Sequence, residues 1–173
     1  MVQALTNLDN ENALNLKIDN RTLTQLNLSH RSLENELMID SLVFTSGGIF
    51  VIQYNEARGM IDGTQERPIW LSDGDVRMKN PLQENEKIIQ ALKNIIPPYF
   101  HDYFYSIVGF KKRVKINVPG NHKNIEGNQW LLSESEIPEY IERIILKKNV
   151  QQQKPIKPHH LNILERGFSW MNK

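Results

Sequence analysis

The chain of 173 residues is long enough to bury one hydrophobic core, and its 24% charged and 39% hydrophobic residues are ordinary for a globular protein. A formal net charge of +1 excludes a polycation, so any nucleic-acid surface has to be a local patch. The absence of cysteine excludes disulfides, thiolate metal sites and a cysteine nucleophile. The polar N-terminus lacks a hydrophobic signal core, and no apolar run approaches the ~20 residues that span a bilayer. These features predict a cytoplasmic protein with no membrane partner.

Strand signals dominate the first part of the chain. Alternating apolar residues predict a strand over 23–28, and the apolar run Leu37–Thr45 predicts a second. The pair Gly47-Gly48 suits a tight turn, because glycine adopts positive φ at little cost. The β-branched and aromatic residues of Ile49–Tyr54 then predict a strand buried on both faces. We expect these last two strands to be adjacent, antiparallel and near the middle of one sheet.

A hairpin and a helix are predicted next. Residues 59–63 and 68–71 have the composition of a short hairpin. Asn80 is a good helix cap and Pro81 a good first helical residue, so a helix is expected over 82–96. Its apolar stripe should face the sheet, with its charged residues more exposed. The positions that test this are Ile88, Leu92 and Ile96 for the stripe, and Glu84 and Lys87 for the exposed face.

The last third predicts more strands and a second helix. Apolar runs indicate strands over 105–110 and 114–118. Ser133 and Glu136 have capping-box spacing, and isoleucines from Ile137 onward form a helical stripe. An order of strands, helix, strands and helix predicts a mixed sheet with helices packed against it.

The domain organisation expected is one domain over 1–149, in which 1–22 is an uncertain N-terminal element. The polar, proline-containing stretch 150–158 is interpreted as a linker. Residues 159–173 are interpreted as a helical appendage, which either packs back on the domain or begins a binding element.

Several short motifs occur in a defined order. Asp40 lies on an apolar strand, and a glycine turn leads into a second apolar strand. A G-x-I-x-G segment follows over 59–63, then Trp70, and then Asn80-Pro81-x-Gln83 at a helix start. In order and spacing this segment resembles the nuclease-related (NERD) domain, a family of the PD-(D/E)XK nuclease superfamily. The resemblance covers roughly residues 23 to 145. It implies an α/β, restriction-endonuclease-like fold with a mixed central sheet flanked by helices.

The resemblance also implies a site, and the chain departs from it. The family pattern has an acidic residue, an apolar residue and Asp on one strand, and Glu-x-Lys on the next. Carboxylates of this kind hold Mg²⁺, and the lysine stabilises developing charge. Here Asp40 and Gln83 match, whereas Met38, Gln53 and Asn55 stand where the family has an acid, Glu and Lys. The implied catalytic set Asp40, Gln53, Asn55 and Gln83 is therefore vestigial, Asp40 alone is left for a metal, and no cofactor is expected.

Replacement groups are available in principle. Glu56 could supply the missing carboxylate only if the strand bulges, because it lies three residues beyond Gln53 and faces the other side. Lys79 or Lys87 could supply a cation from another element, although lysines near a helix start are usually solvated. If such replacements operate, the domain is an active Mg²⁺-dependent nuclease.

The densest basic group offers a separate nucleic-acid contact. Its members either contact phosphates or form a charged hairpin turn between two strands. The group consists of Lys111, Lys112, Arg113 and Lys115.

Three functional hypotheses follow. The first is a catalytically degenerate domain that binds DNA or a protein partner in bacterial or mobile-element nucleic-acid processing. The second is an active metal-dependent nuclease that uses Asp40 with a displaced acid and lysine. The third is a purely structural interaction module that docks through its C-terminal helix.

Overall fold

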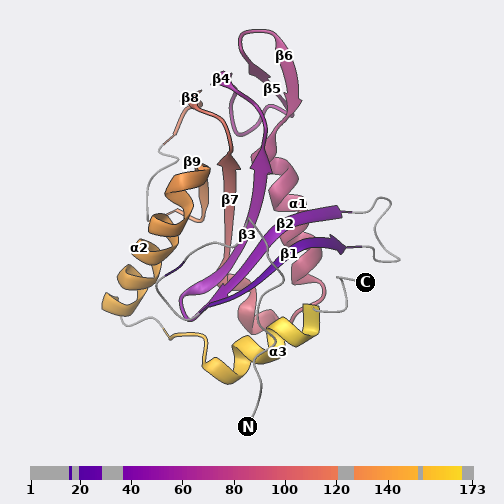
Figure 1. Cartoon of the computed structure of the whole chain (residues 1–173). Helices are drawn as coiled ribbons and strands as arrows, with labels where there is room; N and C mark the ends of the chain where they lie inside the picture. Colours follow the sequence, from indigo (N-terminus) through magenta and orange to yellow (C-terminus); the bar gives the residue numbers. More distant parts are fainter. Residues whose placement is uncertain (1–15, 17–19, 29–36, 121–126, 152–153, 169–173) are drawn as a thin grey trace.

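The computed structural model describes residues 16, 20–28, 37–120, 127–151 and 154–168 (Figure 1). Most of the N-terminal element expected over 1–22 lies outside these residues, as do the last five residues of the expected C-terminal appendage.

A five-stranded mixed sheet forms the centre of the fold. Its order is β1-β2-β3-β7-β9, in which β1, β2 and β3 are antiparallel neighbours while β3, β7 and β9 run parallel. The expected pairing of the second and third strands near the middle of one sheet is confirmed. The strands are β1 (Asn20–Leu28), β2 (Leu37–Thr45), β3 (Gly48–Asn55), β7 (Phe104–Phe110) and β9 (Gln129–Ser133).

A second, four-stranded sheet lies beyond the carboxyl ends of β3 and β7, at the top of Figure 1. The chain of β3 continues into β4 and that of β7 into β8, and β4 and β8 are again parallel neighbours. The predicted hairpin is confirmed as the antiparallel pair β4–β5, and β6 adds an edge strand that was not anticipated. The order is β6-β5-β4-β8, with β4 (Gly59–Asp62), β5 (Ile69–Ser72), β6 (Val76–Lys79) and β8 (Val114–Asn117).

Helices cover both faces of the central sheet. One face is covered by α1 and α3, and the other by α2 (Figure 1). The helical elements are α1 (Pro81–Lys93), η1 (Pro98–Tyr103), η2 (Glu134–Glu136), α2 (Ile137–Val150) and α3 (Pro158–Phe168). A mixed sheet between helical layers confirms the expected restriction-endonuclease-like fold class.

Local chemistry explains where the two long helices begin. The Asn80 side chain accepts from the backbone N–H groups of Leu82 and Gln83, and Pro81 occupies the first position of α1. The capping box between Ser133 and Glu136 precedes α2, as expected. Both helix starts are therefore determined by the sequence next to them.

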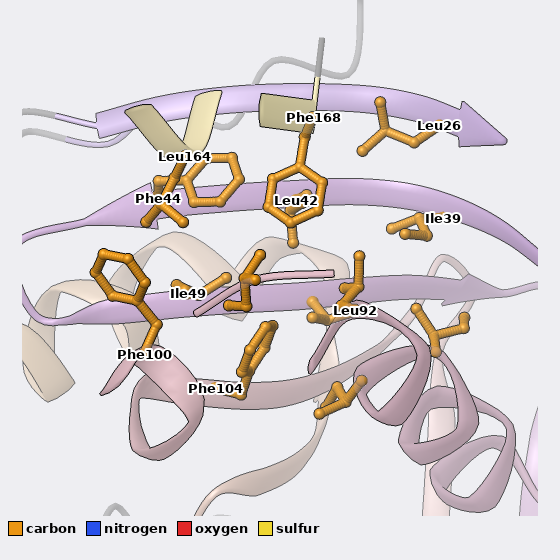
Figure 2. Packing of buried hydrophobic residues seen from close by; sticks show 14 of the residues in the cluster. Leu26, Ile39, Leu42, Phe44, Ile49, Leu92, Phe100, Phe104, Leu164 and Phe168 are labelled. Atoms are coloured by element: carbon orange, nitrogen blue, oxygen red, sulfur yellow. The ribbon is translucent and has the colours of Figure 1, made fainter. Parts of the chain in front are cut away.

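The core under α1 and α3 is shown in Figure 2. The helix ends at Lys93 rather than at the expected Ile96, but the three stripe positions are buried as predicted, with Leu92 at 0% exposure. The Glu84 and Lys87 side chains are 39% and 63% exposed. Phe168 of α3 stacks on Phe44 at 5.7 Å between ring centroids (Figure 2). Ile156, just before α3, is also buried. The C-terminal helix therefore packs back on the sheet, which is one of the two arrangements expected for it. None of the described helices has the length and apolar character needed to cross a membrane.

Candidate functional site

The carboxyl ends of three parallel strands meet at one edge of the central sheet. Parallel strands of an open α/β sheet place their following loops together at such an edge, which is where ligands usually bind. Here β3 ends at Asn55, β7 at Phe110 and β9 at Ser133. The strand β2 runs antiparallel to β3, so the part of β2 that contains Asp40 lies at the same edge. The fold thus brings Asp40, Gln53 and Asn55 to one edge of the sheet. The basic turn that follows β7, residues 111–113, lies at the same edge.

Asp40 and Gln53 lie where β2 separates from β3. The β2–β3 pairing runs only as far as Ser41 opposite Ile52. Beyond it, the backbone N–H of Tyr54 donates to Oδ2 of Asp40 at 2.7 Å. In the opposite direction, Nε2 of Gln53 donates to the backbone oxygen of Met38 at 2.6 Å.

These two bonds replace rungs of the backbone ladder. A strand N–H or C=O that leaves its ladder needs another partner unless water reaches it. Asp40 supplies an acceptor from β2 to β3, and Gln53 supplies a donor from β3 to β2. The two side chains therefore connect the diverging strands.

Asn55 ends β3 in a turn. Its Oδ1 accepts from the backbone N–H of Ala57 at 2.8 Å, which is the usual way an Asn side chain stabilises a turn two residues on. Its backbone oxygen accepts from the N–H of Lys111 at 3.2 Å. The Asn55 amide oxygen thus turns the chain from the central sheet toward the second sheet.

Gln83 contacts a loop rather than the other predicted site residues. Its Nε2 donates to the backbone oxygen of Gln65 at 2.8 Å. Nδ2 of Asn80 donates to the same oxygen at 2.9 Å and to that of Arg67 at 2.9 Å. The indole N–H of Trp70 donates to the oxygen of Thr64 at 2.8 Å. The Trp and Asn-Pro-x-Gln motifs together fix this loop against the start of α1.

The G-x-I-x-G segment has a steric explanation. Gly59 has φ of +71°, and a Cβ there would lie 1.5 Å from Oδ1 of Asp73. A Cβ at Gly63 would lie 2.4 Å from the Trp70 ring. Ile61 between them is fully buried. The motif is required by backbone conformation and close packing.

The candidate displaced acid is engaged by the basic turn. Glu56 pairs with Lys111 at 2.9 Å and with Lys112 at 3.8 Å. The hydrogen bond with Lys111 lowers the pKa of the Glu56 carboxyl, and the same bond raises the pKa of Lys111. All three side chains are at least 40% exposed, so water screens the pairs and their contribution to stability is small.

A shallow cavity lies beside this turn. It has a volume of about 540 Å³ and lies between the residues after β7 and the residues around η2. The Lys111 ammonium lies 5.7 Å from the centroid of the Tyr54 ring. Burial, followed by the negative charges of Glu134 and Asp40, raises the pKa of Tyr54 to about 12. The edge therefore combines carboxylates and ammonium groups around a neutral tyrosine.

Lys79 and Lys87, the two lysines considered as replacements for the missing one, lie near the start of α1 and not at this edge. Nζ of Lys87 is 2.6 Å from Oε1 of Glu84, and Nζ of Lys79 is 4.0 Å from Oε2 of the same residue. Both therefore pair with a carboxylate on α1.

Basic side chains also gather on the outer face of the second sheet. Arg77 lies opposite Leu71, and Leu71 lies opposite Asp62. Met60 lies two residues from Asp62 on the same strand and opposite Lys115, so Arg77 and Lys115 share one face, which also carries the Asp62 carboxylate. Across the described residues neither Arg77 nor Lys115 makes an ion pair, and the same holds for Arg113. Sequence reasoning identified Lys115 and missed Arg77, because the four residues of β6 (Val76–Lys79) are too few for alternation to identify a face.

Among the residues that the structure describes, the β2–β3 separation does not offer the ligands that Mg²⁺ requires. Mg²⁺ requires several oxygen ligands in near-octahedral geometry and usually one or two carboxylates. Among the described residues, Asp40 is the only carboxylate at the β2–β3 separation, and one of its oxygens already accepts from Tyr54. Over the ranges that the structure describes, no three Asp, Glu or His side chains gather closely enough to hold a metal.

The fold and this edge define the class as a restriction-endonuclease-like α/β domain. A family model described as "Nuclease-related domain" (NERD) matches residues 5–111. The chain belongs to the NERD family. Searches among curated proteins and among solved structures found no match.

Proposed function

We propose that this chain is a catalytically degenerate nuclease-related domain that binds nucleic acid without cutting it. The observation that carries the proposal is the use of the catalytic positions. Asp40 and Gln53 connect β2 to β3, and the Asn55 oxygen holds a turn. The positions from which a nuclease addresses a metal and a phosphate are engaged in holding the backbone.

The binding surface proposed is the outer face of the second sheet with the neighbouring basic turn. Lys111 and Lys112 are partly neutralised by Glu56, whereas Arg113, Lys115 and Arg77 are exposed and without an acidic partner in the described chain. Arginine and lysine side chains that neutralise phosphates give binding that is independent of sequence and falls with salt. We therefore infer phosphate-backbone recognition rather than recognition of base edges.

One observation favours the nuclease alternative. The negative charge of Asp40 contributes to the raised pKa of Lys111, so this ammonium is within electrostatic range of the surviving aspartate. Lys111 and Glu56 would then replace the missing lysine and acid. Their mutual bond at 2.9 Å counts against this role, because each neutralises the other.

The experiment is a binding and cleavage assay on the same samples. Fluorescence anisotropy with single- and double-stranded DNA and RNA should detect binding that weakens with salt. The double change Arg77→Gln with Lys115→Gln should reduce the salt slope by about 2, since each phosphate that is no longer neutralised lowers the slope by about 1. Lys87→Gln is the matched control, because Lys87 is paired on α1. If the double change alters neither the affinity nor the salt slope, the proposed surface is refuted.

Cleavage is tested in Mg²⁺ and Mn²⁺ beside an Asp40→Ala sample. We expect no cleavage by the unaltered protein. Cleavage that disappears in the Asp40→Ala sample would refute degeneracy. A further loss with Lys111→Gln would assign the lysine role to Lys111.

A further inference from the structure

A polar cavity lies at the opposite edge of the central sheet. It has a volume of about 530 Å³, which is within the range of small-molecule sites. The amino ends of β7 and β9 form one side, and the last turns of α1 and α2 form the other. Asp40 lies beside Tyr54 near the carboxyl end of β3, which runs parallel to β7, so the two sites lie at opposite ends of these strands.

Cationic side chains from two helices converge on this cavity. Lys93 comes from the last turn of α1, and Lys147 and Lys148 come from the last turn of α2. His101 of η1 adds a titratable ring, and Asp102 is the one carboxylate among the described lining residues. The lining therefore has a net positive charge.

Lysines in a last helical turn have an ordinary explanation, since they interact favourably with the helix dipole. Two details go beyond it. The Lys148 ammonium lies 4.9 Å from the centroid of the Tyr105 ring, and the Lys93 ammonium lies 5.9 Å from that of Phe104. Attraction between a cation and a ring face holds such groups in place. The helix dipole alone would leave both side chains free to extend into water.

The ammonium of Lys148 is partly dehydrated. Burial lowers the pKa of Lys148, while the Tyr103 hydroxyl and the Asp102 carboxylate act in the opposite direction. In the part of the chain that the structure describes, neither Lys93 nor Lys148 makes an ion pair. A cation that has lost part of its hydration gains most from a nearby anion. The cavity is thus prepared for negative charge.

We propose that this cavity binds a phosphate-bearing anion, held mainly by Lys93 and Lys148. A phosphate monoester carries a charge of about −1.5 to −2 at neutral pH and several strong acceptor oxygens, which suits convergent ammonium groups. Asn128 and Gln151 line the same cavity with neutral polar groups. Two sources share this chemistry: a free nucleotide and the terminal phosphate of a nucleic acid.

The test is isothermal titration of the full chain with inorganic phosphate, a nucleoside triphosphate, and an oligonucleotide with either a 5′-phosphate or a 5′-hydroxyl. Lys93→Gln and Lys148→Gln should each weaken phosphate-dependent binding by about tenfold or more, the usual effect of losing a charge-assisted hydrogen bond. Lys87→Gln, on the same helix as Lys93 but paired with Glu84, should bind as the unaltered chain does. Phosphate should also raise the melting temperature of the unaltered chain and not that of the two variants.

The different ligands of this titration distinguish a free nucleotide from the terminal phosphate of a nucleic acid. A preference for the 5′-phosphorylated oligonucleotide identifies a nucleic-acid end. Binding of the triphosphate, with no difference between the two oligonucleotides, identifies a free nucleotide. In either case NMR amide shifts should centre on Gly127 and Asn128. The proposal is overturned if none of these ligands binds at millimolar concentration, or if Lys93→Gln and Lys148→Gln leave the affinity unchanged. It is also overturned if the amide shifts centre on the turn after β7.

Discussion

Removing the Asp40 carboxylate should destabilise the protein. In Asp40→Ala the Tyr54 N–H loses its acceptor at 2.7 Å, at a position where β2 and β3 no longer share ladder bonds. A hydrogen bond to a charged group contributes about 1.5–3 kcal/mol, and partial exposure of Asp40 places the expected loss near the lower value, at about 1–2 kcal/mol. Asp40→Asn keeps an acceptor oxygen and should lose about half of this or less.

Urea unfolding monitored by circular dichroism measures the effect. Gln53→Ala should cost about 0.5–1.5 kcal/mol, because its bond to the Met38 oxygen joins neutral groups. The double variant tests coupling, since both side chains hold the same pair of strands and the effects of neighbouring residues are rarely additive. A carboxylate retained for catalysis alone is usually neutral or destabilising to the fold. An Asp40→Ala protein as stable as the unaltered chain, or more stable, would refute the connecting role.

Three further outcomes are expected from urea midpoints. Leu92→Ala should lose about 2–5 kcal/mol because Leu92 is fully buried, whereas Leu146→Ala, at a 63% exposed position, should change little. Gly63→Ala should lose about 1–3 kcal/mol through its clash with the buried indole, whereas Gly167→Ala, in open space on a helix, should gain about 0.5–1 kcal/mol. Burial lowers the pKa of His160, so the neutral imidazole is favoured in the folded state. The resulting contribution to folding stability is present above pH ~6.5 and is lost as pH falls through the pKa of the folded state. His160→Gln should therefore lose less stability between pH 7 and 5 than the unaltered chain.

The central elements could be predicted because their signals are local. The apolar runs on either side of Gly47-Gly48 determine β2, β3 and the turn between them. Asn80 and Pro81 mark the start of α1, and its burial follows from a periodic stripe. The resemblance to the nuclease-related family then supplied the arrangement of the layers, which local signals do not contain.

The hairpin β4–β5 and a strand over 114–118 were predicted, but the second sheet as a separate unit was not. Its strands are four residues long, too short for alternation to identify a face. Their separation from the central sheet depends on bends after β3 and β7, which involve the Asn55 turn and the Glu56–Lys111 pair. Glu56 and Lys111 lie more than fifty residues apart in the chain, so no local pattern reveals their pairing.

The cavity at the opposite edge was missed for a related reason. Lys93 and Lys148 are ordinary lysines at helix ends when each is considered in its own segment. Only the parallel strands β7 and β9, which bring the ends of α1 and α2 to one edge, make them neighbours. A cationic site built from two helix ends is a property of topology.

The identity of Gln53 is linked to the position of β2. Its amide donates to the Met38 oxygen at 2.6 Å, a bond that a carboxylate at this position could not make, because a glutamate has only acceptor oxygens at neutral pH. The change Gln53→Glu would therefore place two acceptors against each other, and β2 or the side chain would have to move before a metal could be held. Adding Asn55→Lys would also remove the acceptor for Ala57. Restoring the family's Glu and Lys thus requires both strand ends to rearrange, so recovery of metal binding should precede recovery of turnover, and a loss of stability should accompany both.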